Sequence, residues 1–186
     1  MDSKLQIISG KYRGRRLNLP PDARPTQNRA RIALFNMLES GIINPTDHIC
    51  VWDAFAGSGA FGLECVSRYP DATVVFTDTA ASSVRTITDN IKRLGEHDRC
   101  QIIQADAVGN TEKIAADADL IFVDPPYAMR ELGDGLVRRA ANVVKSGTIL
   151  IWEQEIGHEV APNADAWEVL RDKTYGRARF LILRKN

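Results

Sequence analysis

The sequence is poor in the residues that build disulfide frameworks and metal sites. Its 186 residues include 3 cysteines and 3 histidines, and the histidines are scattered along the chain. The cysteines are odd in number and form no Cys-x-x-Cys pair, which excludes the cross-linked scaffold of a small secreted protein. We therefore expect reduced thiols and no bound metal ion. The cysteines are Cys50, Cys65 and Cys100.

The chain also lacks an apolar run long enough to span a bilayer. Its first residues have no apolar stretch of the kind that a signal peptide needs. We expect a cytoplasmic protein that does not contact a membrane and, because no coiled-coil segment is visible, a monomer. The composition, 44% hydrophobic and 26% charged, is that of a globular domain able to bury its own core.

A net charge is absent as well, because 24 basic residues balance 24 acidic ones. The distribution is uneven: residues 1–31 contain eight basic and two acidic residues, so they carry +6 and the remainder carries −6. A polyanion would be attracted to this end of the chain. The basic cluster can neutralise phosphates, although a solvated charged face is the alternative. The candidate phosphate contacts are Lys11, Arg13, Arg15, Arg16, Arg24 and Arg29.

The first forty residues are predicted to form a small hairpin followed by a helix. Residues 5–8 and 15–19 are strand candidates on either side of glycine turns, and prolines then interrupt regular structure. Thr26 has the side chain of an N-cap for a helix that reaches about residue 40. The apolar face of this helix would contain Ile32, Phe35 and Leu38, with Leu34 beside it.

The rest of the chain alternates between strand and helix patterns. This rhythm predicts an α/β protein with a doubly wound parallel sheet, whose strand order the pattern does not give. The last two strands are separated only by a short turn and should form an antiparallel hairpin. We expect strands at 49–54, 73–77, 101–104, 120–123, 148–152, 167–173 and 179–183, and helices at 60–68, 80–94, 111–116 and 131–144.

A glycine-rich loop follows the first of these strands and precedes a helix. Gly57, Gly59 and Gly62 fit the spacing G-x-G-x-x-G, in which glycines allow a tight turn and a close approach of the backbone to a ligand. Asp78 lies 21 residues after Gly57, where a carboxylate can accept hydrogen bonds from ribose hydroxyls. The pattern indicates an adenosine-containing cofactor. The alternative is a glycine turn that packs a helix on a strand, with a surface aspartate.

The side chains around this loop distinguish between cofactors. A dinucleotide would place its pyrophosphate at the helix N-terminus, whereas S-adenosylmethionine has an ammonium group and requires acceptors there. Asp53, four residues before Gly57, supplies such a carboxylate, which favours the methyl donor over NAD. We also assign Phe55 in the loop, and Asp106 and Ala107 after the third strand, to the cofactor site. For Asp106 an ordinary helix N-cap is the alternative.

The most informative segment is Asp124-Pro125-Pro126-Tyr127, which directly follows an apolar strand. The prolines stiffen the backbone and remove two N–H donors, so nearby carbonyls are free to accept. An amino nitrogen conjugated to a ring is a poor nucleophile. An aspartate oxygen and a backbone carbonyl could hold its two N–H groups and orient its lone pair toward a methyl group. Tyr127 offers a flat face on which an extruded base can stack. A proline-rich loop that ends a strand is the alternative.

Taken together, these segments resemble the bacterial 16S ribosomal RNA guanine-N2 methyltransferase family. The resemblance covers nearly the whole chain. The Asp-Pro-Pro-Tyr element marks amino-group methyltransferases of several kinds, whereas the N-terminal Gly-Lys-x-x-Gly-Arg and Arg-Pro-Thr elements point to this family. The matching segments are residues 8–15, 24–26 with 29, 33–36, 53–59, 124–127 and 175–176.

The resemblance implies a Rossmann-like class I methyltransferase fold, a seven-stranded and mostly parallel sheet with an antiparallel last strand. It implies a methyltransferase domain at 41–186 and a basic extension at 1–40 that grips RNA. Asp53, Gly57, Gly59, Asp78 and Asp106 would surround S-adenosylmethionine, and residues 124–127 would surround the target guanine. The expected partner is 16S ribosomal RNA within the small ribosomal subunit or an assembly intermediate.

Three other functions remain open at this point. The same Asp-Pro-Pro-Tyr chemistry serves the N6 amino group of adenine in nucleic acid and the side-chain amide of a protein glutamine. The literal G-x-G-x-x-G with Asp78 is compatible with a NAD-dependent oxidoreductase, although that function does not explain residues 124–127. A non-catalytic RNA-binding protein on a methyltransferase scaffold is the third.

Overall fold

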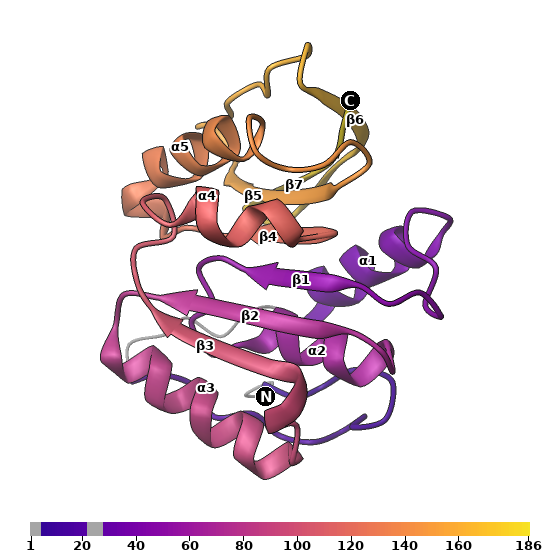
Figure 1. Ribbon diagram of the computed structural model, residues 1–186, viewed down its shortest axis with the longest axis vertical. Helices are drawn as coiled ribbons and strands as arrows, with labels where there is room; N and C mark the ends of the chain where they lie inside the picture. Colours follow the sequence, from indigo (N-terminus) through magenta and orange to yellow (C-terminus); the bar gives the residue numbers. More distant parts are fainter. Residues whose placement is uncertain (1–4, 22–27) are drawn as a thin grey trace.

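A computed structural model of the chain describes residues 5–21 and 28–186. Its centre is one twisted sheet of seven strands in the order β3-β2-β1-β4-β5-β7-β6 (Figure 1). Strand β7 runs antiparallel to both of its neighbours, and the other pairs are parallel. The predicted fold class is confirmed. The strands are β1 (Cys50–Asp53), β2 (Thr73–Asp78), β3 (Cys100–Gln104), β4 (Leu120–Val123), β5 (Ile149–Glu155), β6 (Trp167–Tyr175) and β7 (Ala178–Lys185).

Helices cover both faces of the sheet, because alternate residues of each strand belong to two separate hydrophobic clusters. Val51 of β1 packs with α1, α2 and α3 on one face, whereas its neighbour Trp52 packs with α5 and the segment around Ala115 on the other. The α-helices are α1 (Asn28–Glu39), α2 (Ala60–Arg68), α3 (Ala81–Leu94), α4 (Thr111–Ile114) and α5 (Glu131–Ala140). Single turns of 3-10 helix are His97–Arg99, Ala115–Asp117 and Tyr127–Met129.

The strand order reverses at β1, which lies between β2 and β4. The carboxyl ends of β1, β2 and β3 point to the same edge of the sheet (Figure 1). In doubly wound sheets the crevice outside these ends, at the reversal, is the place where ligands bind. Every loop that the sequence assigned to chemistry leaves the sheet at this edge.

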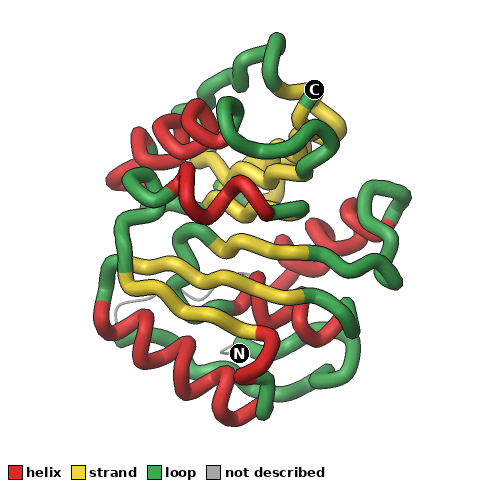
Figure 2. The backbone as a smooth tube through the Cα atoms, in the orientation of Figure 1, coloured by secondary structure: helices red, strands yellow, loops and turns green. Residues whose placement is uncertain are grey.

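The N-terminal segment forms the predicted antiparallel pairing, but in a shorter version. One isolated bridge joins Gln6 and Arg16, flanked by backbone hydrogen bonds from Ile7 to Arg15 and from Leu17 to Leu5. Regular strands do not form here because the backbone of residues 8–12 bonds to α2 instead. The chain that follows Arg16 then runs along α2 and α3, where the N–H of Asn18 bonds to Asn90 (Figure 2).

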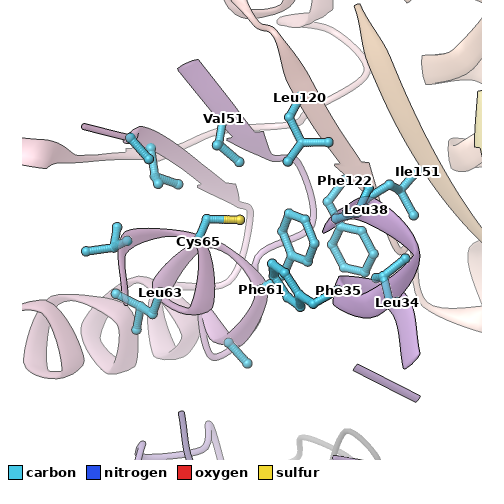
Figure 3. Close-up of a cluster of buried hydrophobic side chains, with 14 of the residues drawn as sticks. Leu34, Phe35, Leu38, Val51, Phe61, Leu63, Cys65, Leu120, Phe122 and Ile151 are labelled. Atoms are coloured by element: carbon cyan, nitrogen blue, oxygen red, sulfur yellow. The ribbon is translucent and has the colours of Figure 1, made fainter. Parts of the chain in front are cut away.

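Helix α1 shares its core with the sheet, and its buried face differs from the predicted one. Phe35 stacks on Phe61 of α2 with ring centroids 5.3 Å apart, and Phe61 stacks on Phe122 of β4 at 4.1 Å (Figure 3). The prediction for Ile32 was wrong, since its side chain is exposed, whereas Arg31 is buried. Leu34, Phe35 and Leu38 are buried as predicted. Arg31 can be buried beside them because it pairs with buried Glu64. The predicted N-cap, Thr26, lies outside the described residues.

No helix in the two described ranges is long and apolar enough to cross a membrane.

Candidate active site

A cleft of about 1040 Å³ opens at the carboxyl edge of the sheet. Loops after β1, β2, β3 and β4 form its walls, and the turn between β6 and β7 closes one side. The cleft brings together all but one of the side chains and loop residues that the sequence assigned to a cofactor or to catalysis. These lining residues are Asp53, Phe55, Gly57, Asp78, Asp106, Ala107, Asp124, Pro125, Pro126 and Tyr127.

The exception is Gly59, which lies at the N-cap of α2 with φ of +76° rather than on the cleft wall. A Cβ atom at this position would already touch Phe76 and Ile87 at 3.3 Å. Gly62 is tighter still, because its Cβ would lie 2.3 Å from the Phe76 ring. Within the glycine loop, therefore, Gly57 lies at the cleft, whereas the other two glycines let α2 pack closely against β2.

Asp78 fixes the glycine loop in place. One of its carboxylate oxygens accepts the Gly57 N–H at 2.8 Å, and the other accepts the Ala80 N–H at 2.8 Å. A ligand hydroxyl can still approach this carboxylate, because each oxygen has two lone pairs and the side chain is only half-buried. The carboxylate is thus aligned at the end of β2, inside the cleft.

Asp53 is buried at the base of the same loop, with 1% of its surface exposed. Its Oδ2 accepts the N–H of Gly62 in the first turn of α2 at 3.0 Å. Burial raises the pKa of Asp53 to about 7, the Gly62 hydrogen bond opposes this rise, and the charge of Asp78 adds to it. Within the described ranges, no hydrogen bond to Oδ1 is found, so this oxygen remains available to a donor in the cleft.

Asp106 forms the helix-capping hydrogen bonds that the sequence offered as an alternative to a role in cofactor binding. Its two oxygens accept the N–H groups of Val108 at 3.2 Å and Gly109 at 2.7 Å, which closes the turn before α4. Ala107 next to it is buried and packs in the second hydrophobic cluster. The side chain of Asp106 shapes the cleft wall, and no backbone acceptor for the N–H of Ala107 is found among the described residues.

The Asp124–Tyr127 segment forms the wall opposite the glycine loop. The carbonyl of Pro126 accepts the N–H of Met129 at 2.7 Å and so begins a 3-10 turn. Pro125 packs against α5 so closely that a Cβ at Gly133 would lie 3.0 Å from its ring. Asp124 is half-buried, and burial, together with the charges of Glu153 and Asp53, raises its pKa well above the usual range.

Glu153 is the residue that the sequence reasoning missed. The predicted strand stopped at residue 152, whereas β5 continues to Glu155. Glu153 lines the cleft and accepts the Tyr127 O–H at 3.1 Å. Burial raises the pKa of Glu153 to about 7. A signal was present in the sequence, because Glu153 follows an apolar strand directly, as Asp124 does.

The predicted N-terminal RNA contacts that the structure describes are not among the residues that line the cleft. Arg13, Arg15, Arg16 and Arg29 are exposed, and Lys11 is exposed while it bonds to Glu96 at 3.0 Å. Arg24 lies outside the described residues. Arg31, which was not singled out as a contact, is the basic residue of this segment that reaches the cleft wall.

Comparison with known proteins identifies the family. Residues 5–184 match the model of the family described as conserved hypothetical protein 95. The chain belongs to this family. It is 34% identical to ribosomal RNA small subunit methyltransferase D from Buchnera aphidicola subsp. Acyrthosiphon pisum, over 83% of this chain and 80% of that protein. It is 29% identical to the protein of the same name from Escherichia coli strain K12, over 98% of this chain and 90% of that protein.

The fold agrees with this membership. The solved structure of yhhF from Escherichia coli matches with a TM-score of 0.83 at 27% identity and covers 98% of both chains. The family resemblance seen in the N-terminal and Asp-Pro-Pro-Tyr elements is confirmed.

Proposed function

We propose that this chain is an S-adenosylmethionine-dependent methyltransferase of ribosomal RNA, and that it methylates the exocyclic N2 of a guanine in 16S ribosomal RNA. The observation that carries the proposal is the shared cleft, which has Asp124–Tyr127 on one wall and the glycine loop with Asp78 on the other. The names of the relatives support ribosomal RNA as the substrate. The choice of guanine N2 rests on the sequence resemblance.

The cleft suits S-adenosylmethionine better than a dinucleotide. The N–H groups of Gly57 and Gly62 at the start of α2 already bond to Asp78 and Asp53, so a pyrophosphate would meet two carboxylates instead of free donors. These carboxylates match an ammonium group and ribose hydroxyls. The backbone N–H of Ala107, which has no backbone acceptor among the described residues, would bond adenine. Bound S-adenosylmethionine supplies a methyl group activated by a sulfonium.

The residues of the opposite wall orient the amino group. Asp124 Oδ and a backbone carbonyl of the two prolines accept its N–H bonds, which directs the nitrogen lone pair at the methyl group. The nitrogen loses one proton as it gains the methyl carbon. Asp124 can accept that proton, because its surroundings raise its pKa. Tyr127 holds the base by stacking while its hydroxyl bonds to Glu153.

We assign RNA binding to the basic extension at residues 1–40 and catalysis to residues 41–186. The division is one of function, since Phe35 of the extension lies in the same hydrophobic cluster as the sheet. Arg13, Arg15 and Arg16 are exposed on one short segment, where they can neutralise phosphates of RNA. We expect a monomer that acts in the cytoplasm on the small ribosomal subunit or its assembly intermediate.

The test compares ribosomal RNA from cells with and without the protein. Mass spectrometry of its nucleosides should show one N2-methylguanosine that depends on the gene, and the purified protein should restore it with S-adenosylmethionine. If cells without the protein instead lack an N6-methyladenosine, the acceptor is adenine. If they lack a methylglutamine in a ribosomal protein, the acceptor is glutamine. Tight binding of NAD without binding of S-adenosylmethionine would reject the proposal altogether.

A further inference from the structure

Three carboxyl groups converge on the floor of the cleft from three adjacent strands. Asp53 ends β1 and pairs with Phe122 of β4. Val123 of β4 pairs with Trp152 of β5, so Asp124 and Glu153 are the next residues out of two neighbouring parallel strands. Carboxylates on neighbouring strands repel each other, and burial removes the water that would screen their charges. The arrangement therefore costs stability unless a ligand with several donors occupies it.

Glu153 is held so that one oxygen remains available. Its Oε1 accepts the Tyr127 hydroxyl at 3.1 Å. Its Oε2 has no hydrogen bond to any residue within 5–21 or 28–186, and the same is true of the Asp124 carboxyl. Tyr127 in turn follows the two prolines, which restrict the backbone that carries it. The orientation of Glu153 is thus tied to the segment that would hold the amino group.

The donor pattern of the acceptor base decides which base suits two carboxylates. Guanine presents N1–H directly beside the N2 amino group, so adjacent donors face the same side. Adenine presents a lone pair at N1 beside its amino group, and a glutamine amide presents a carbonyl oxygen beside its nitrogen. With the two N–H bonds of the amino group held by Asp124 and a proline carbonyl, guanine still has N1–H to donate to Glu153, whereas adenine and glutamine would direct an acceptor at Glu153, which is unfavourable in a buried site.

We propose that Glu153 is a specificity-determining residue that accepts the N1–H of the target guanine through Oε2, while Asp124 accepts from N2. The proposal rests on the proposed function, methylation of guanine N2, and adds the residue that selects guanine. Extruded bases are read through hydrogen bonds to their Watson–Crick edge, and Glu153 supplies that contact. Tyr127 acts through Glu153 as a positioning residue in addition to its stacking role.

The experiment uses small-subunit particles from cells that lack the protein, with the target first located by the wild-type reaction. A second substrate carries 2-aminopurine at the target nucleotide, which keeps the N2 amino group and lacks the N1 proton. Wild-type protein should favour guanine over 2-aminopurine by about 10- to 100-fold in kcat/KM, as expected for one lost hydrogen bond to a charged group.

The variant E153Q should lower kcat/KM on guanine by about 10- to 100-fold and reduce the preference over 2-aminopurine to within a few-fold, because its amide can donate to the unprotonated N1. Binding of S-adenosylmethionine should stay within twofold of the wild type. The control is E168Q, which removes the same charge from an exposed pair with Arg184, and it should match the wild type in every measurement.

Two results overturn the proposal in different ways. If the wild-type protein produces no N2-methylguanosine, the proposed function and this inference fail together. If the wild type does so, but E153Q keeps the full preference for guanine, only the role of Glu153 fails. If E153Q loses cofactor binding, the variant Y127F is measured instead, because it keeps the aromatic ring and removes the hydrogen bond to Glu153. An undiminished preference of Y127F for guanine over 2-aminopurine would then overturn the proposal.

Discussion

Two groups of buried or half-buried acidic side chains in this molecule have opposite surroundings. Glu64 in α2 has no exposed surface, accepts the N–H groups of Ile8 and Ser9 at 2.8 and 3.0 Å, and bonds to Arg68 at 2.8 Å. Glu96 accepts from Tyr12 and Arg99 and pairs with Lys11. These two carboxylates fasten the N-terminal extension to the sheet domain.

Three of the carboxyl groups that line the cleft, those of Asp53, Asp124 and Glu153, lack such a set of partners among the described residues. Within the described ranges, Asp53 accepts a single backbone N–H and Glu153 a single hydroxyl, and the neighbouring charges that add to burial in raising the pKa values of Asp53 and Asp124 are those of other acids. A buried carboxylate with a full set of donors stabilises a fold, whereas one that lacks them is retained for another purpose. The comparison therefore separates the acids that serve structure from those that serve chemistry.

The largest effect should come from breaking the structural group. Replacing Glu64 with Ala removes the acidic partner of buried Arg31, one of the two acidic partners of Arg68 and the acceptor of two backbone N–H groups, so the free energy of unfolding should fall by about 3–5 kcal/mol. Urea denaturation of the variant and of E168Q measures this change. A loss below about 1 kcal/mol would mean that the extension is held mainly by its apolar contacts.

The same kind of change in the cleft should affect activity instead of stability. Asp124→Asn should reduce methyl transfer by about 100- to 1000-fold, because the amide orients the amino group poorly and cannot take its proton. The variant should melt at the same temperature as the wild type or higher, since Asn replaces an acid whose charged form is disfavoured by burial and by the neighbouring carboxylates. Substantial unfolding of this variant would remove the distinction between the two groups.

The dependence of stability on pH should show both groups in one experiment. Hydrogen bonds from Arg99, Tyr12 and Lys11 lower the pKa of Glu96 to about 2, so its contribution is present above pH 4.5 and is lost as the pH falls toward 2.

The cleft acids have the opposite sign. Burial raises the pKa values of Asp53 and Glu153 to about 7, so the folded state keeps protons that the unfolded state has released, and stability falls as the pH rises from about 4 to 7. Thermal melting of the ligand-free protein against pH measures both limbs. E96Q should reduce only the loss of stability at acid pH, and E153Q should reduce only the loss of stability as the pH rises toward 7. The opposite result, in which each variant affects the other pH range, would contradict the comparison.

The smallest effect concerns RNA affinity. Replacing Arg13, Arg15 and Arg16 with Gln should weaken RNA binding and reduce the slope of log affinity against log salt by about 0.7 per lost phosphate contact. Lys11 is left intact because it bonds to Glu96. Arg138→Gln on α5, also exposed, serves as the control. An unchanged slope would place the RNA surface on another part of the molecule.

The sequence predicted most of the sheet because its strands are short apolar runs at regular spacing. A site at the carboxyl edge follows from the alternation of parallel strands with helices. It did not predict the burial of Arg31 in place of Ile32, since that depends on Glu64, 33 residues further along the chain. Glu153 was missed for a similar reason. Its place directly after an apolar run was visible in the sequence, but its position beside Asp124 depends on the register that pairs β5 with β4, which no local pattern contains.

The close packing of helix α5 limits how far the Asp124–Tyr127 segment can move. At Gly133 a Cβ atom would lie 2.7 Å from the Trp152 indole nitrogen and 3.0 Å from the Pro125 ring, so the gap holds a hydrogen atom and nothing larger. Any side chain there would push the Asp124–Tyr127 segment into the cleft by a fraction of an ångström. Engineering for bulkier acceptors should therefore begin at the exposed rim residue Met129, where the cleft can widen without moving the helix against which the reactive segment is aligned.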